Sequence, residues 1–229
     1  MKMQTKGWGS LNTWALSGVV ASLFYVAHVV AGRMVWPDYN PLAQPISDLT
    51  ASSAVSQSLA SRILYGYDFF NLLFCFVLLV YFRKVRRINN VFYGGIVLKT
   101  IAEVLSTVGY KLFPLADTDW TSSFQNNMHY AITGVIVLSY IVLALLLTIG
   151  LARTRKYPTM TRFLSLFSIV FITSGFLTVM VANIQPQYVG LVERINLYAL
   201  MVSNVALALW VFSHQARKEG SSCLYSLIL

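Results

Sequence analysis

The residues best placed to do chemistry in this chain are Lys99 and Glu103, which stand four positions apart in an otherwise apolar stretch. Side chains at i and i+4 share one face of a helix, so this ammonium and this carboxylate can pair. If the stretch crosses a membrane, each charge costs about 2.5–3.5 kcal/mol near the centre and is a functional candidate by default. The spacing predicts either a structural pair that fixes helix packing, or a charged site for a ligand head group or a proton-coupled step.

Three further ionisable residues, His28, Asp68 and His129, lie near one end of three different apolar stretches. Neutral imidazole and carboxylate groups suit zinc, and a catalytic zinc needs three protein ligands and an open position for water. The chain has no H-E-x-x-H motif, however, and a single membrane histidine also serves to hydrogen-bond a neighbouring helix. Zinc is therefore a candidate cofactor that the pattern does not favour.

A polar stretch, PDYNPLAQPISDL at positions 37–49, follows the first apolar segment. Its prolines at 37, 41 and 45 fix φ and remove backbone donors, so the stretch cannot be a helix interior. Ser47 or Asp48 could cap a short helix running towards Arg62. The same two residues could instead supply a hydroxyl and a carboxylate for catalysis. We expect a structured loop that either covers helix ends or forms part of a site.

The remaining candidates lie beside later apolar segments. Glu193 begins the last segment, where a carboxylate suits the positive end of the helix dipole. Arg194 could hold Asp48, Asp119 or a phosphate-bearing head group with two parallel hydrogen bonds. The catalytic candidates are Ser47, Asp48, Asp117, Asp119 and His129. The ligand-binding candidates are Asp48, Asp68, Lys99, Glu103, His129, Glu193 and Arg194.

The composition shows which class of protein must position these residues. Of the 229 residues, 57% are hydrophobic and 11% are charged, whereas soluble domains carry about 25% charged residues. The chain is therefore expected to cross a membrane several times. Its net charge of +9 does not indicate a nucleic-acid partner, because the basic residues flank apolar segments. Cys75 and Cys223 do not make a disulfide framework.

Six apolar segments are long enough to span the hydrocarbon core, which takes about 20 residues. We expect an all-α fold of six transmembrane helices, at about 11–32, 63–82, 91–113, 129–151, 162–184 and 191–212. Residues 1–216 would form one domain and residues 217–229 a cytoplasmic tail. The first segment follows two lysines as a signal peptide does, but its apolar run is long for one, so we expect it to remain uncleaved.

The basic residues predict the orientation of these helices. Twelve of the 17 fall on one side, which the positive-inside rule makes cytoplasmic; they are Lys2, Lys6, Arg83, Lys84, Arg86, Arg87, Arg153, Arg155, Lys156, Arg162, Arg217 and Lys218. The protein would then lie in the plasma membrane with both termini in the cytoplasm. Most acidic residues fall on the opposite side, which predicts a polar cavity that opens outward.

Three motifs resemble family 998 of the domains of unknown function. They are PDYNPLAQPISDL after the first segment, LFPLADTD followed by MHYAITG, and GLVERINLY at the start of the sixth segment. The resemblance covers nearly the whole chain, and the order of the three motifs makes it specific. The resemblance implies a small polytopic membrane protein and assigns no activity. It highlights Pro45, Ser47, Asp48, Pro114, Asp117 or Asp119, His129 and Arg194.

These patterns predict a membrane protein that binds or handles a lipid-like or amphiphilic molecule from the outer leaflet. Its partners would be membrane lipids and that molecule, with no nucleic acid. One alternative is a membrane-embedded lipid hydrolase that uses zinc or a carboxylate-activated water. Another is a small transporter, although the six segments show no paired broken helices of the kind that mark many transporter sites.

The predicted orientation can be tested by labelling in intact cells. A cysteine at Asp119 should react with a membrane-impermeant thiol reagent from outside, whereas a cysteine at Arg87 should react only after the membrane is opened. The reverse pattern would put the acidic residues in the cytoplasm and overturn the outward-facing site.

Overall fold

A computed structural model of the chain describes residues 9–118 and 121–226, with side chains described over 11–118 and 121–213. All regular elements of this described part are helical. In chain order they are α1 (Gly9–Trp14), α2 (Ser17–Val35), η2 (Ile46–Thr50), α3 (Gln57–Val80), η3 (Tyr81–Val85), α4 (Asn90–Leu112), α5 (Phe124–Ala152), α6 (Pro158–Ile184), η4 (Pro186–Tyr188) and α7 (Val189–Ser226).

Within the described residues, six helices are long and apolar enough to cross a membrane. This confirms the predicted all-α fold with six candidate spans. The first of these spans consists of most of α1 together with α2, and the second consists of α3 together with the π-helical turn η3. The six spans are Leu11–Val35, Gln57–Val85, Asn90–Leu112, Phe124–Ala152, Pro158–Ile184 and Pro186–Ser213. The chain is thus a multi-pass membrane protein.

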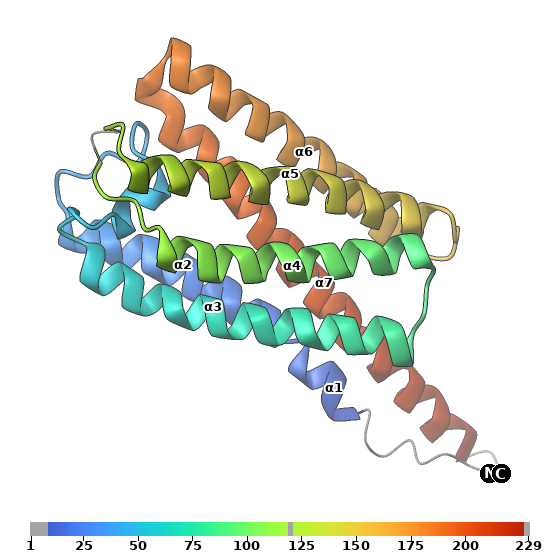
Figure 1. Cartoon of the computed structure of the whole chain (residues 1–229). Helices are drawn as coiled ribbons and strands as arrows, with labels where there is room; N and C mark the ends of the chain where they lie inside the picture. The colour runs from blue at the N-terminus through green and yellow to red at the C-terminus, as the bar shows by residue number, and fades with distance from the viewer. Residues whose placement is uncertain (1–8, 119–120, 227–229) are drawn as a thin grey trace.

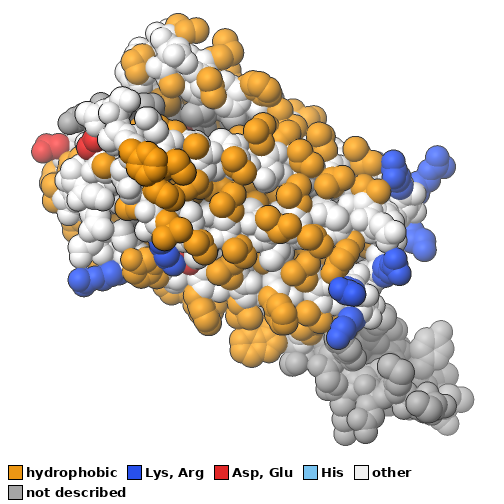
Figure 2. Space-filling view, viewed as in Figure 1, with side chains coloured by type: hydrophobic (Ala, Val, Ile, Leu, Met, Phe, Trp, Pro, Cys, Tyr) orange, Lys and Arg blue, Asp and Glu red, His pale blue; other side chains and the backbone are white. Residues whose placement is uncertain are grey.

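The helices run up and down, so their connections gather at two ends of the bundle (Figure 1). The loop end holds the described connecting residues 36–56, 113–118, 121–123 and 185–188. The basic end holds the connections 86–89 and 153–157 together with η3. Hydrophobic side chains are spread over the visible face between the ends, and most of the visible Lys and Arg side chains lie at the basic end (Figure 2). This separation is what a bundle that lies across a bilayer requires.

Neighbouring helices pack most extensively as pairs, namely α2 with α3, α4 with α5, and α6 with α7. The α4–α5 pair is held close by glycine. A Cβ atom added to Gly150 would lie 2.5 Å from the backbone nitrogen of Phe92 and 2.7 Å from its Cα. Small residues let helix backbones approach in this way in membranes, where packing rather than hydrophobicity drives association.

The loop after α2 differs from the prediction. A helix that begins near Ser47 and runs towards Arg62 is wrong, because only the short 3₁₀ helix η2 forms there, with Pro45 at its N-cap, and α3 starts separately at Gln57. The Ser56 hydroxyl donates back to the carbonyl of Leu49 at 2.8 Å. The backbone N–H of Ile46 donates to Glu193 near the start of α7. The segment therefore forms two elements, of which the first is fastened to α7.

The close approach at Gly150 gives a stability test with a matched control in the same helix. Gly150→Ala should lower the free energy of unfolding by about 1–3 kcal/mol, because the new methyl group meets backbone that cannot move aside. Gly134→Ala should be neutral or stabilising, since a Cβ there has no atom within 4 Å and alanine favours helix by about 1 kcal/mol over glycine. The check is the melting temperature of each variant in detergent; equal values would mean that α4 and α5 do not touch at Gly150.

Candidate functional site

The centre of the bundle holds a buried ion pair. Lys99 Nζ lies 2.9 Å from Glu103 Oε1 in the middle of α4, as their spacing predicts. The two residues are 2% and 3% exposed. The pair is therefore sealed in this conformation and does not lie in an open, outward-facing cavity. Because both ions are out of water, their stability depends on mutual pairing and on further hydrogen bonds.

Hydrogen bonds from two other helices reach the ion pair, and a third helix joins them through an asparagine. The Tyr140 hydroxyl on α5 donates to Glu103 Oε1. The Tyr67 hydroxyl on α3 donates to Glu103 Oε2 at 3.5 Å. Asn71 Nδ2 donates to the Tyr67 oxygen at 3.0 Å, and Asn204 Nδ2 on α7 donates to Asn71 Oδ1 at 3.2 Å. We call Tyr67, Asn71, Lys99, Glu103, Tyr140 and Asn204 the polar network.

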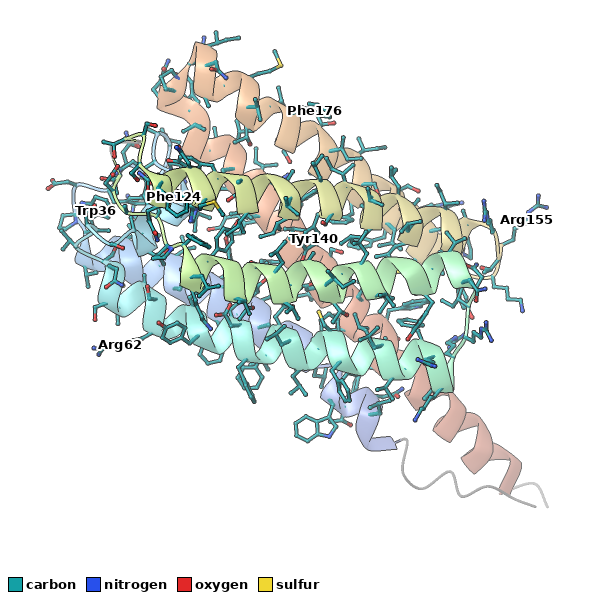
Figure 3. The ribbon with its side chains drawn as sticks, viewed as in Figure 1. Trp36, Arg62, Phe124, Tyr140, Arg155 and Phe176 are labelled. Atoms are coloured by element: carbon teal, nitrogen blue, oxygen red, sulfur yellow. The ribbon has the colours of Figure 1, made fainter. Side chains whose placement is uncertain are left out.

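The polar network touches all three of the closely packed helix pairs. Its residues lie on α3, on α4 and α5, and on α7. Tyr140 lies near the middle of the bundle, between Phe124 at the loop end and Arg155 at the basic end (Figure 3). A hydrogen-bonded group of this kind holds the pairs in one arrangement, because moving any pair would leave a buried polar atom without its partner.

Sequence reasoning found Lys99 and Glu103 but missed the other four members of the polar network. One signal was present in the sequence: Tyr67 and Asn71 have the same i, i+4 spacing as the ion pair. Asn71 and Asn204 are also amides within apolar spans, where such groups bond between helices. Tyr140 carried no comparable signal, since tyrosine is common in this chain.

Tyr25 on α2 packs against the polar network. The Tyr25 ring on α2 meets the Tyr67 ring edge to face, with centroids 5.2 Å apart, and the His28 ring at 4.7 Å. Tyr25 also lies within electrostatic range of Glu193, Arg194, Tyr110 and Tyr198. The Tyr25 ring thus lies between Tyr67 of the polar network and His28.

Arg194 fastens the first loop to α7. Its guanidinium donates to the backbone carbonyls of Pro41 at 2.5 Å and Gln44 at 2.9 Å, and to the Tyr39 hydroxyl. Burial raises the pKa of Tyr39, so its hydroxyl stays protonated and donates to the Pro45 carbonyl at 2.7 Å. The predicted partners of Arg194 were carboxylates or a phosphate, whereas the acceptors found are loop carbonyls and a phenol.

Glu193, beside Arg194, makes the complementary contact. Its Oε2 atom accepts the backbone N–H of Ile46 at 2.6 Å. Consecutive residues of α7 thus satisfy both kinds of backbone group in the loop, one donating to carbonyls and the other accepting from an amide. Since irregular backbone at a membrane boundary needs such partners, these two residues account for the fixed shape of the loop.

The second loop is fastened in the same manner by α5. Asn126 is fully buried; its Oδ1 accepts the Ala116 N–H at 2.8 Å and its Nδ2 donates to Asp117 at 3.1 Å. His129 Nδ1 lies 3.0 Å from the Phe113 carbonyl. The Ser52 N–H donates to the Leu115 carbonyl at 2.8 Å and joins the two loops. We call residues 36–56 and 113–118 together the lid.

His28, Asp68 and His129, the candidate zinc ligands, each have other neighbours in the structure. Asp68 pairs with Lys111 on the neighbouring helix at 2.9 Å, and the His129 ring stacks on Tyr110 with centroids 4.8 Å apart. His28 packs against Tyr25 instead. No group of three His, Cys, Asp or Glu residues in the part of the chain that the structure describes could hold a metal ion.

The loop-end catalytic candidates have different surroundings. Asp48 is 1% exposed within η2. Asp117 accepts hydrogen bonds from the hydroxyl and backbone N–H of Thr121. Tyr130 lies within electrostatic range of both of these carboxylates. The carbonyl of Ser47 accepts from the Thr50 hydroxyl at 3.1 Å, and Asp119 lies outside the described residues. A catalytic role for any of them stays a prediction.

A bundle of six long apolar helices with basic residues gathered at one end is typical of a multi-pass membrane protein. The family model described as "Protein of unknown function (DUF998)" matches residues 19–210, so the chain belongs to that family, as its three motifs predict. No curated protein and no solved structure matches the chain. The motif residues Pro45, Asp117 and Arg194 all lie in the lid or hold it.

A double-mutant cycle measures how far the ion pair matters for stability. Lys99→Met or Glu103→Gln alone should destabilise the protein by about 3–5 kcal/mol, because each leaves a buried charge without its partner. The double variant should lose much less than the sum. The control cycle uses Lys111→Met and Asp68→Asn. Because the Lys111 side chain is 48% exposed, this pair should give a coupling of about 0–1 kcal/mol. Equal couplings in unfolding titrations would contradict the special role of the buried pair.

Proposed function

We propose that this protein binds the polar head group of an amphiphilic molecule at the polar network. The observation that carries the proposal is the Lys99–Glu103 pair, which is almost wholly buried at the centre of a membrane-spanning bundle. A packed apolar centre would serve a purely structural bundle at lower cost. Ionisable residues kept at such depth commonly take part in binding or transfer.

The chemistry of the site suits an amphiphile. Lys99 offers donors and Glu103 offers acceptors, so a head group with both kinds of group can replace Tyr67 and Tyr140 as hydrogen-bonding partners. The aromatic rings of Tyr25 and Tyr67 give an apolar surface with polar edges beside it. The head group of such a ligand would thus meet polar partners, with aromatic rings beside them.

Binding requires the bundle to open, because the pair is sealed in this conformation. The polar network joins the helix pairs, and a head group that takes over its hydrogen bonds would let the pairs separate at low cost. A ligand shifts such an equilibrium only by its preference for the open state. The same arrangement favours a small transporter as a second candidate, in which the pairs move against one another about a central site.

We infer that the loop end faces outward in the plasma membrane, with both termini in the cytoplasm. The support is the gathering of Lys and Arg at the basic end, which the positive-inside rule makes cytoplasmic (Figure 2). Residues 1–216 would then form the membrane domain, followed by a short cytoplasmic tail. In this orientation the lid covers the route from the outer leaflet to the polar network.

The test is ligand-induced stabilisation of the purified protein. Single-chain amphiphiles with zwitterionic, anionic, cationic and uncharged head groups are titrated while the melting temperature is recorded, since a bound ligand stabilises by about 2.7 kcal/mol at one hundred times its dissociation constant. We expect saturable stabilisation by at least one charged head group. Glu103→Gln and the milder Tyr67→Phe should weaken it about tenfold, in line with the loss of a charge-assisted hydrogen bond.

Asp68→Asn is the matched control, because it removes a carboxylate from the neighbouring helix outside the polar network. It should leave the response unchanged. A response that no head group saturates, or that Asp68→Asn weakens as much as Glu103→Gln, would refute the site. Conversion of an ester-linked amphiphile into products during the titration would instead support the lipid hydrolase.

A further inference from the structure

A second polar site lies at the opposite end of the bundle from the lid. A cavity of about 340 Å³ opens there, lined by Phe82, Arg83, Arg87, Asn90 and Tyr93. It lies where the span Gln57–Val85 ends and the span Asn90–Leu112 begins. We call it the basic pocket. Its volume is at the lower end of the range for small-molecule sites, about 300–1,000 Å³, and suits one head group.

The backbone around the basic pocket is shaped by a π-helical turn. In η3 the Arg86 N–H bonds to the carbonyl of Tyr81, five residues earlier, at 2.9 Å. Turns of this kind are rare and occur often at functional sites. Past the turn the chain bends directly into α4, whose N-cap Asn89 accepts from the Phe92 N–H. The positive end of the α4 dipole therefore lies beside the pocket.

The arginines that follow α3 make different contacts. Arg86 donates through Nε and Nη2 to the Tyr157 hydroxyl at 3.0 and 2.8 Å, and its guanidinium lies over the Tyr157 ring. It thereby joins the two connections at the basic end. Arg83 and Arg87 line the basic pocket instead, and Arg87 is held there by a 2.8 Å hydrogen bond to Asn90 Oδ1.

The positive charge of the basic pocket has no carboxylate partner among the side chains that the structure describes. Among the described side chains, no carboxylate forms an ion pair with Arg83 or Arg87. One wall is apolar and fixed, because the buried Phe82 ring packs on Phe92 and Trp210 with centroids 4.9 and 5.7 Å apart. The pocket thus joins two guanidinium groups, a helix N-terminus and an aromatic wall.

We propose that the basic pocket binds the phosphate group of an anionic phospholipid. Guanidinium groups hold phosphate oxygens with paired hydrogen bonds, and a helix N-terminus adds backbone donors. The source is a lipid because the pocket lies at the edge of two membrane spans and is walled by aromatic rings, which suits the boundary of head group and acyl chain. A lipid bound there bridges α3 and α4 at the basic end, away from the polar network.

The experiment measures the binding of phosphatidylglycerol to the whole chain in phosphatidylcholine nanodiscs, by the rise in melting temperature as its share increases. The variant is Arg83→Gln with Arg87→Gln. Its matched control is Arg153→Gln with Lys156→Gln, which removes the same charge from the other connection at the basic end. We expect the first variant to need about tenfold more phosphatidylglycerol for the same shift, because it loses charge-assisted hydrogen bonds to the phosphate. The control should behave as the wild type within about twofold.

Further measurements distinguish a specific phosphate site from diffuse attraction to a charged surface. They also distinguish a lipid ligand from a soluble anion. Equal weakening in both double variants would show diffuse attraction to the membrane and overturn the proposal. Stabilisation by inorganic phosphate or glycerol 3-phosphate equal to that by phosphatidylglycerol would overturn the lipid assignment. Arg87→Lys, which keeps the charge and loses the paired geometry, should give an intermediate loss; full wild-type affinity in that variant would argue against a built phosphate site.

Discussion

The structure depends on accommodating one buried lysine–glutamate pair in the middle of a long apolar helix. Their mutual attraction offsets only part of the desolvation penalty, so the remaining hydrogen-bonding capacity must be filled by neighbours. Tyr67 and Tyr140 fill it directly, and the two asparagines extend the contact to α7. The need to neutralise one carboxylate thus fixes the rotation of four helices about their axes. Packing of apolar side chains alone would leave those rotations less strictly defined.

A second constraint acts on the backbone of the lid. Its prolines cannot donate, and its carbonyls lie where regular helix hydrogen bonds have ended. Arg194, Asn126 and His129 supply the missing partners from two different helices. The residues that the family motifs highlight are therefore explained, in part, by the shape of the lid. A role for them in binding or catalysis would come in addition to this one.

Much of the fold could be predicted from the sequence, because the length of an apolar run translates directly into a membrane span. The Lys99–Glu103 contact was predictable as well, since helix periodicity alone brings those side chains together. The acceptors of Arg194 were not, because backbone carbonyls leave no trace in the residue types. The partners Tyr140 and Asn204 depend on helix rotation, which hydropathy does not encode. Because hydropathy gives the depth of a residue but not the rotation of its helix, His28, Asp68 and His129 could be placed at similar depths and yet do not meet.

The contacts of Arg194 and Glu193 also bear on how the chain is made. They join α7 to a loop about 150 positions earlier, through hydrogen bonds to Pro41, Gln44 and Ile46. Because a ribosome delivers the chain from its N-terminus, the first loop leaves the insertion machinery long before its partners exist. It must wait, with its carbonyls in water, until the last helix enters the bilayer. Closure of the lid is therefore an event of final assembly, and a chain truncated before α7 would insert its earlier helices without completing it.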